Sequence, residues 1–121
     1  MNKIESREDY LEAILEISQE KEFVRCIDIA NRLNFSRASV TIAMQKLEEE
    51  KLIHIDSKRR LSLTDEGLKI ANETLEKHKF LTQMFIKMDI NELEAEKMAC
   101  AIEHSISHDA FEKMKKYSNN H

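Results

Sequence analysis

The stretch DIANRLNFSRASVTIAMQKLEEEKLI, residues 28–53, decides the fold. It contains two runs of apolar residues at helical spacing, with a few polar residues between them. Asn34 is suited to end a helix, and Ser36 is suited to cap the start of the next one. We therefore expect helices over about 27–33 and 37–51. Two short helices joined this closely predict a helix-turn-helix.

The residues that follow alternate between apolar and polar side chains, as short strands do. Residues 52–55 and 61–64 show this alternation, and the polar, basic segment 56–60 lies between them. The pattern predicts a β-hairpin wing. A further amphipathic helix is expected over about 6–20, with Ser6 as its cap. Together these elements predict an N-terminal winged helix-turn-helix.

The distribution of charge indicates where a nucleic acid would bind. The chain as a whole has a net charge of −4, but residues 24–65 carry eight basic and six acidic side chains. Because duplex DNA is a polyanion, this net basic segment is where we expect it to lie. The alternative is a solvated basic face on a helical domain that binds another protein.

The expected DNA contacts come from the helix that begins after Ser36 and from the tip of the wing. The first turns of that helix would face base edges in the major groove, and the remaining side chains would hold phosphates. The base-facing residues are Arg37, Ala38, Ser39 and Ile42; the phosphate-binding residues are Thr41, Gln45, Lys46, Lys58, Arg59 and Arg60.

Three groups of potential metal ligands flank the winged helix. Within CAIEH at 100–104, a thiol, a carboxylate and an imidazole are spaced i, i+3 and i+4, so they would share one face of a helix. Asp9 and Glu12 form an i, i+3 pair near the start of the chain, and His78 lies in a third segment. Each group also has an ordinary interpretation: a buried thiol, a surface pair, or carboxylates at a helix start. The spacing alone leaves both interpretations open.

The C-terminal half is expected to be helical as well. The chain has no proline and a single glycine, Gly67, which favours helices joined by polar connections. We expect helices over about 66–88 and 91–106, and a short one ending near residue 117. The fold class is therefore mainly α.

No targeting or membrane signal is evident in the sequence. There is no apolar run long enough to span a bilayer and no signal-peptide pattern at the start. We therefore expect a cytoplasmic protein without a membrane partner. Its two cysteines, Cys26 and Cys100, would stay thiols there, which leaves Cys100 available to a metal.

At these residues the chain resembles the diphtheria-toxin-repressor and manganese-transport-regulator family of metal-dependent repressors. The resemblance runs over nearly the whole length. It is carried by EDYLEAI at 8–14, DIANRL at 28–33, SRASVT at 36–41, KLEEEKLI at 46–53, LSLTDEG at 61–67 and AIEHSIS at 101–107. The family implies a homodimer that binds palindromic operators in double-stranded DNA when loaded with divalent iron or manganese. It implies a DNA-binding domain over 1–65 and a helical metal-binding and dimerisation domain over 66–121.

The resemblance also implies a ligand set. Carried onto this sequence, the ligands of the manganese branch fall on Asp9, Glu12, His78, Cys100, Glu103 and His104. The departure is Cys100, where manganese-type members have glutamate and iron-type members have cysteine. The resemblance implies Fe²⁺ or Mn²⁺ as the cofactor. Because a thiolate is softer than a carboxylate, Cys100 favours iron, cobalt, nickel or zinc over manganese, so Zn²⁺, Co²⁺ and Ni²⁺ remain alternatives.

Two other functions remain open from the residues alone. A metal-independent winged-helix regulator that senses redox state or an organic ligand would keep the DNA contacts and use Cys100 as a core residue or a sensor. A hydrolytic metalloenzyme would use the carboxylate–histidine cluster to activate water, but the sequence shows no Gly-rich loop and little room for a substrate pocket. We therefore expect a metal-dependent regulator of metal-homeostasis genes, acting as a repressor, with no enzymatic activity and no small organic substrate.

Overall fold

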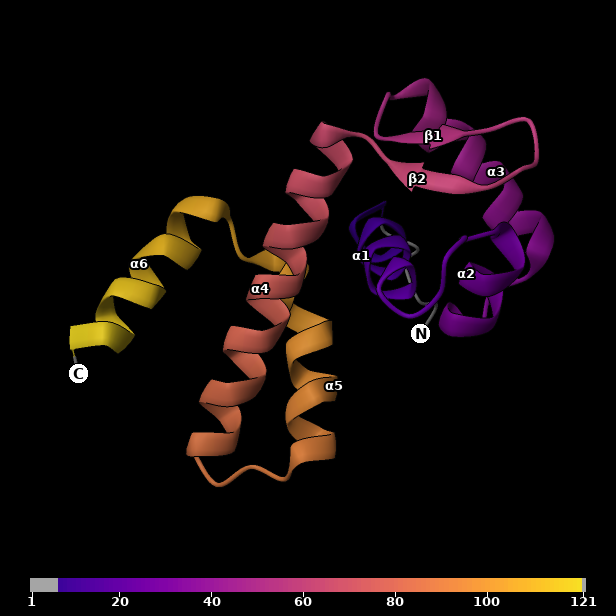
Figure 1. Ribbon diagram of the computed structural model, residues 1–121. Coiled ribbons are helices and arrows are strands. Elements are labelled where there is room, and N and C mark those ends of the chain that lie inside the picture. The colour runs from indigo at the N-terminus through magenta and orange to yellow at the C-terminus, as the bar shows by residue number, and fades with distance from the viewer. Residues whose placement is uncertain (1–6, 121) are drawn as a thin grey trace. The chain divides into compact units, whose positions relative to one another are not determined.

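The computed structural model describes residues 7–120, which form two compact units with their boundary between Glu73 and Thr74. The first unit contains α1 (Arg7–Ser18), α2 (Cys26–Leu33), α3 (Arg37–Glu49), the strands β1 (Ile53–Ile55) and β2 (Leu61–Leu63), and the start of α4 (Asp65–Lys87). The second contains the rest of α4, α5 (Glu92–Ile102), the 3-10 turn η1 (Glu103–Ser105) and α6 (His108–Asn120). Figure 1 shows these elements along the chain. The expected cap Ser6 lies outside the described residues.

The helix-turn-helix is formed by α2 and α3, and local side-chain chemistry sets the turn between them. Asn34 ends α2 in the left-handed conformation, with φ of 60°, which asparagine tolerates better than most residues. Ser36 caps α3, because its hydroxyl accepts a hydrogen bond from the Ser39 N–H at 3.1 Å. Phe35 lies between them and packs its ring against Tyr10 of α1, with 5.8 Å between centroids. The predicted mainly α fold with an N-terminal winged helix-turn-helix is confirmed.

The start of α2 is capped by the carboxylate of Asp28, in the first turn of the helix. In the structure the Arg25 N–H donates to Asp28 Oδ2 at 2.9 Å, and Lys21 Nζ donates to Oδ1 at 2.9 Å. The pKa of Asp28 is lowered, because these hydrogen bonds outweigh the opposing effect of burial.

The wing is an antiparallel hairpin in which Ile53 pairs with Leu63, His54 with Ser62, and Ile55 with Leu61. Leu61 also extends the pairing to the segment before α2, since its N–H donates to the Val24 carbonyl at 2.7 Å. The two strands therefore hold each other, and the second strand also attaches the hairpin to the segment that leads into α2.

The second unit is built on α4 and α5, which pack through the buried residues Leu81, Phe85, Ala95 and Ala99. Phe111 of α6 is fully buried and meets Phe80 of α4 edge-on, with 5.5 Å between ring centroids. None of the described helices is both long enough and apolar enough to cross a membrane.

Two of the expected helix bounds are wrong. The fifth helix ends at Ile102 and tightens into η1, because long-range contacts hold that turn: Lys77 Nζ donates to the Ile106 carbonyl at 2.6 Å. The sixth helix is not short but has 13 residues. Its start is capped by Ser107, whose hydroxyl accepts from the Ala110 N–H at 3.0 Å, and Phe111 anchors it in the core.

Candidate metal centre and nucleic-acid interface

The second unit brings three of the predicted ligands together around Glu103. This carboxylate lies at the start of η1 and is only 1% exposed. His78 of α4 places Nδ1 at 3.0 Å from Glu103 Oε2. His104 places Nε2 at 3.5 Å from the other oxygen, Oε1. Residues separated by a loop and a helix in sequence thus form one cluster of an acid between two imidazoles.

One oxygen of this buried acid lacks a hydrogen bond. Within residues 7–120, no group donates a hydrogen bond to Glu103 Oε1. A buried carboxylate oxygen in that state costs free energy, so it is suited to accept a cation instead. Carboxylate oxygen and neutral imidazole nitrogen are ligands of divalent transition metals. The residues present therefore fit a site for such an ion.

The other predicted ligands are placed differently. Cys100 lies in α5, one turn before Glu103, and its side chain is exposed whereas that of Glu103 is buried. After Ile102 the α-helix tightens into η1, with Ile102 and Glu103 still in right-handed helical conformation. Asp9 and Glu12 lie one turn apart on α1 of the first unit, and both side chains are partly buried.

The predicted base-reading residues lie on the first turns of α3. Arg37 and Ala38 are exposed and Ser39 is partly buried; the Ser39 N–H donates the capping hydrogen bond to Ser36. Ile42 is an apolar side chain that is 68% exposed. Such an exposed isoleucine at this position is suited to contact a thymine methyl group in the major groove.

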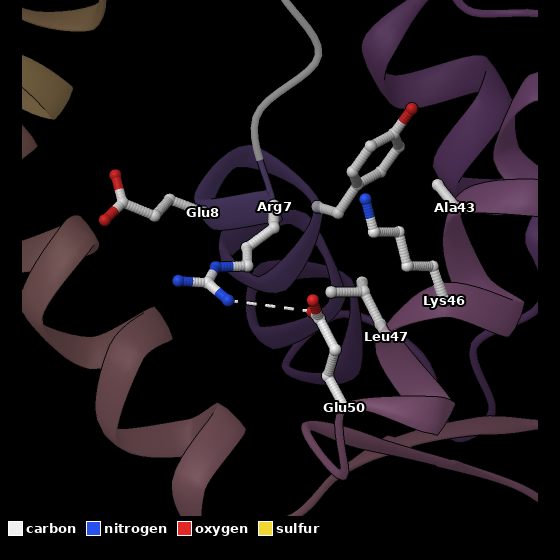
Figure 2. A pocket seen from close by; sticks show the side chains of 7 residues that line it. Arg7, Glu8, Ala43, Lys46, Leu47 and Glu50 are labelled. Carbon is white, nitrogen blue, oxygen red and sulfur yellow. Dashed lines mark ion pairs between the residues drawn. The ribbon is translucent and has the colours of Figure 1, made fainter.

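Among the predicted phosphate contacts, those on α3 differ in their exposure. Gln45 and Lys46 are exposed, whereas Thr41 is partly buried. Lys46 extends from α3 over a hollow beside the start of α1, where Arg7 and Glu50 form an ion pair at 3.6 Å (Figure 2). Glu8 also lines this hollow. Because charges of both signs meet there, the hollow itself favours neither an anion nor a cation.

At the wing, Lys58 and Arg59 are exposed, but Arg60 has protein partners. Its Nε donates to Asp56 Oδ2 at 2.7 Å, and its guanidinium lies 4.2 Å from the centre of the Phe23 ring. Sequence reasoning did not identify Asp56 or Phe23 as part of this surface. The i, i+4 spacing of Asp56 and Arg60 across the loop could have indicated their ion pair. No local pattern in the sequence indicated the contact with Phe23.

Comparison with known proteins identifies both halves of the chain. Residues 4–61 match the family described as "Iron dependent repressor, N-terminal DNA binding domain". Residues 64–121 match "Iron dependent repressor, metal binding and dimerisation domain". The match to a metal-binding domain disfavours the alternative of a metal-independent regulator.

Individual relatives agree with the family models. The HTH-type transcriptional regulator MntR of Geobacillus thermodenitrificans (strain NG80-2) is 33% identical over 109 residues, which cover 90% of this chain and 77% of that protein. The MntR protein of Shouchella clausii (strain KSM-K16) is 34% identical over 109 residues, covering 90% and 76%.

Solved structures are similar over almost the whole chain. The manganese regulator SloR is 26% identical with a TM-score of 0.84, and the match covers 97% of this chain and 55% of that one. The structure of ScaR with bound Zn²⁺ is 28% identical with a TM-score of 0.79, covering 95% and 54%. This chain thus spans just over half the length of these two solved proteins. The protein belongs to the iron-dependent repressor family, that is, to the diphtheria-toxin-repressor and manganese-transport-regulator family of DNA-binding transcriptional regulators that use a divalent transition metal such as Mn²⁺ or Fe²⁺.

Proposed function

We propose that this protein is a cytoplasmic repressor of metal-homeostasis genes that binds a palindromic operator as a homodimer when it is loaded with Fe²⁺ or Mn²⁺. The observation that carries the proposal is the buried Glu103 carboxylate, whose Oε1 receives no hydrogen bond from residues 7–120 although His104 lies 3.5 Å away. We propose no catalytic turnover and no small organic substrate for this cluster.

We propose that the ligands come from both units. His78, Glu103 and His104 would form the part already assembled in the second unit, and the carboxylates of Asp9 and Glu12 would be added from α1. Cys100, one helical turn before Glu103, would be the thiolate ligand of the set. The bound ion would supply positive charge that neutralises the clustered carboxylates and joins the two units.

The chain's own residues then explain how ion and DNA binding are coupled. Without compensation, the carboxylates of Asp9, Glu12 and Glu103 repel one another when brought together, and this opposes a fixed arrangement of the two units. When these carboxylates bind a divalent cation, their attraction to the cation replaces the repulsion among them. Because metal and operator favour the same ordered state, each raises the affinity for the other.

The proposed domain roles follow the sequence boundaries, with DNA binding in 1–65 and metal binding and dimerisation in 66–121. In a two-fold dimer the two α3 helices would enter successive major grooves, with half-sites one helical turn apart. The proposed contacts on the duplex are Arg37, Ala38, Ser39, Thr41, Ile42, Gln45, Lys46, Lys58 and Arg59. For Arg60, which the sequence predicts as a phosphate contact and whose guanidinium has partners within the protein, we propose a positioning role.

Thermal melting of the metal-stripped protein with and without Mn²⁺, anaerobic Fe²⁺, Co²⁺ and Zn²⁺ tests the site. A ligand that binds only the native state raises the unfolding free energy, by about 2.7 kcal/mol at a concentration 100-fold above its Kd, and therefore raises the melting midpoint. Glu103→Gln and His104→Ala should abolish the rise, and Cys100→Ser should change the order of preference among the ions. His54→Ala, an exposed histidine on β1, is the matched control and should keep the full rise. No rise with any of the four ions would refute the proposed site.

A further inference from the structure

The tip of the wing is closed by a small set of contacts centred on Asp56. Its side chain accepts hydrogen bonds from the N–H groups of Lys58 at 2.9 Å and Arg60 at 2.8 Å, and from Arg60 Nε at 2.7 Å. Its main chain exchanges two more: the Asp56 N–H donates to the Arg60 carbonyl at 3.1 Å, and the Arg59 N–H donates to the Asp56 carbonyl at 2.9 Å. The loop is therefore held in a single conformation by one acid.

Arg60 extends these contacts from the loop to the body of the first unit. Its guanidinium is hydrogen-bonded to Asp56 and lies 4.2 Å from the centre of the Phe23 ring, a distance at which a cation is attracted to an aromatic face. Phe23 precedes Val24, whose carbonyl receives the N–H of Leu61 on β2. Asp56, Arg60 and Phe23, which we name the wing clasp, thus fix the loop against the connection between α1 and α2.

The same loop holds Arg59 in an unfavourable backbone conformation. Its φ is 65°, in the left-handed region where a hairpin loop of this kind usually has glycine or asparagine. An arginine there persists only where its surroundings impose the conformation. The wing clasp provides that constraint. Glycine would adopt this conformation without a steric cost.

We infer that the wing clasp is a positioning device for DNA binding: it holds Lys58 and the strained Arg59 toward backbone phosphates, and Arg60 acts through it without contacting the duplex. This inference rests on the proposed contact between wing and DNA. Of the three consecutive basic residues, Lys58 and Arg59 would bind phosphate and Arg60 would position them. From the sequence alone, all three are predicted to bind phosphate.

Arg59→Gly tests the role of the strained residue. The substitution relieves the left-handed backbone, so the melting midpoint should rise. At the same time, binding of the Mn²⁺-loaded protein to a labelled mixed-sequence duplex should weaken. The slope of log K against log salt should become shallower by about 0.9 for each phosphate that the protein no longer neutralises. Unchanged binding by Arg59→Gly would overturn both the inference and the proposed wing contact.

A double-mutant cycle tests whether Arg60 acts through its neighbours. Arg60→Met should weaken duplex binding in the native background, but should have no further effect in the Lys58→Ala/Arg59→Gly background, where nothing is left to position. Additive decreases in affinity would show that Arg60 contacts DNA itself and would overturn the inference while leaving the wing contact intact.

Arg60→Lys is the matched control, because it keeps the charge but cannot stack its planar group on Phe23 while bonding to Asp56. The inference predicts that it weakens binding as Arg60→Met does. Full retention of binding by Arg60→Lys would overturn it. Arg60→Lys also serves as the folded variant if Arg60→Met proves too unstable to measure.

Discussion

Gly67 is the one glycine of the chain, and the structure explains why a side chain is excluded there. It lies in the first turn of α4, where a Cβ atom would be 2.0 Å from the carbonyl oxygen of Leu52 and 3.0 Å from its carbon. Neither atom belongs to a flexible side chain, so the backbone itself must move. The same carbonyl accepts a hydrogen bond from the Thr64 N–H at 3.1 Å, at the junction between the wing and α4. We therefore predict that Gly67→Ala is destabilising.

The expected size of the effect follows from opposing contributions. Displacing packed backbone costs about 1–3 kcal/mol, and losing the Thr64–Leu52 hydrogen bond costs about 1 kcal/mol more. Replacing glycine by alanine inside a helix returns about 1 kcal/mol. The net decrease in unfolding free energy is therefore about 1–3 kcal/mol, which for a protein of this size lowers the melting midpoint by roughly 4–12 °C.

Thermal and urea unfolding of Gly67→Ala against the native chain measures this difference. The exposed Lys69 on the same helix provides the calibration, since Lys69→Ala and Lys69→Gly report the cost of glycine in α4 without a clash. If Gly67→Ala behaves like an ordinary helix position and gains about 1 kcal/mol, the proposed close approach of Leu52 is refuted.

Three further predictions concern the winged helix. Ser36→Ala should lower the unfolding free energy by about 1 kcal/mol in urea denaturation, because it removes the cap of α3; an unchanged midpoint would refute the cap's contribution. Ile42→Ala should change the unfolding free energy by less than about 0.5 kcal/mol, since the side chain is 68% exposed, yet it should weaken binding to an operator selected from random duplexes. Unchanged binding, or a weakening that accompanies a clear loss of stability, would contradict this. The hydrogen bond from the Arg60 N–H lowers the pKa of Asp56 below its ordinary value. The Asp56 carboxylate therefore stabilises the folded state fully above about pH 4, its pKa in the unfolded chain, and this stabilisation is lost as the pH falls through the lower folded pKa. The melting difference between the native chain and Asp56→Asn should therefore shrink below about pH 4, and a constant difference down to pH 2 would contradict the assignment.

Most of the first unit could be predicted from sequence because its turns depend on local chemistry. Asn34 and Ser36 set the bounds of α2 and α3 through contacts within a few residues. Capping hydrogen bonds and the alternation of strand residues are properties of short segments, and such segments carry the signal themselves. The same is true of the paired strands of the wing.

The features that escaped prediction depend on contacts between distant residues. The end of α5 at Ile102 accompanies the contact of Lys77 with the Ile106 carbonyl, 29 residues away along the chain. His78 and Glu103 are 25 residues apart in sequence and 3.0 Å apart in space. Spacing within CAIEH contained no information on the change to η1, and the exposed Cys100 stays a predicted ligand.

The most direct test of the proposed function compares the affinity for DNA with and without metal, in the native chain and in a variant of Glu103. A duplex is selected from a random pool in Mn²⁺, and its Kd is then measured by fluorescence anisotropy in Mn²⁺ and after treatment with chelator. The measurement is made on the native chain, on Glu103→Gln and on the exposed control Glu96→Gln of α5. We predict that Mn²⁺ strengthens binding by the native chain and by Glu96→Gln, and that Glu103→Gln binds weakly in both conditions. Equal Mn²⁺ dependence in Glu103→Gln and in the native chain would contradict the central role of the buried carboxylate.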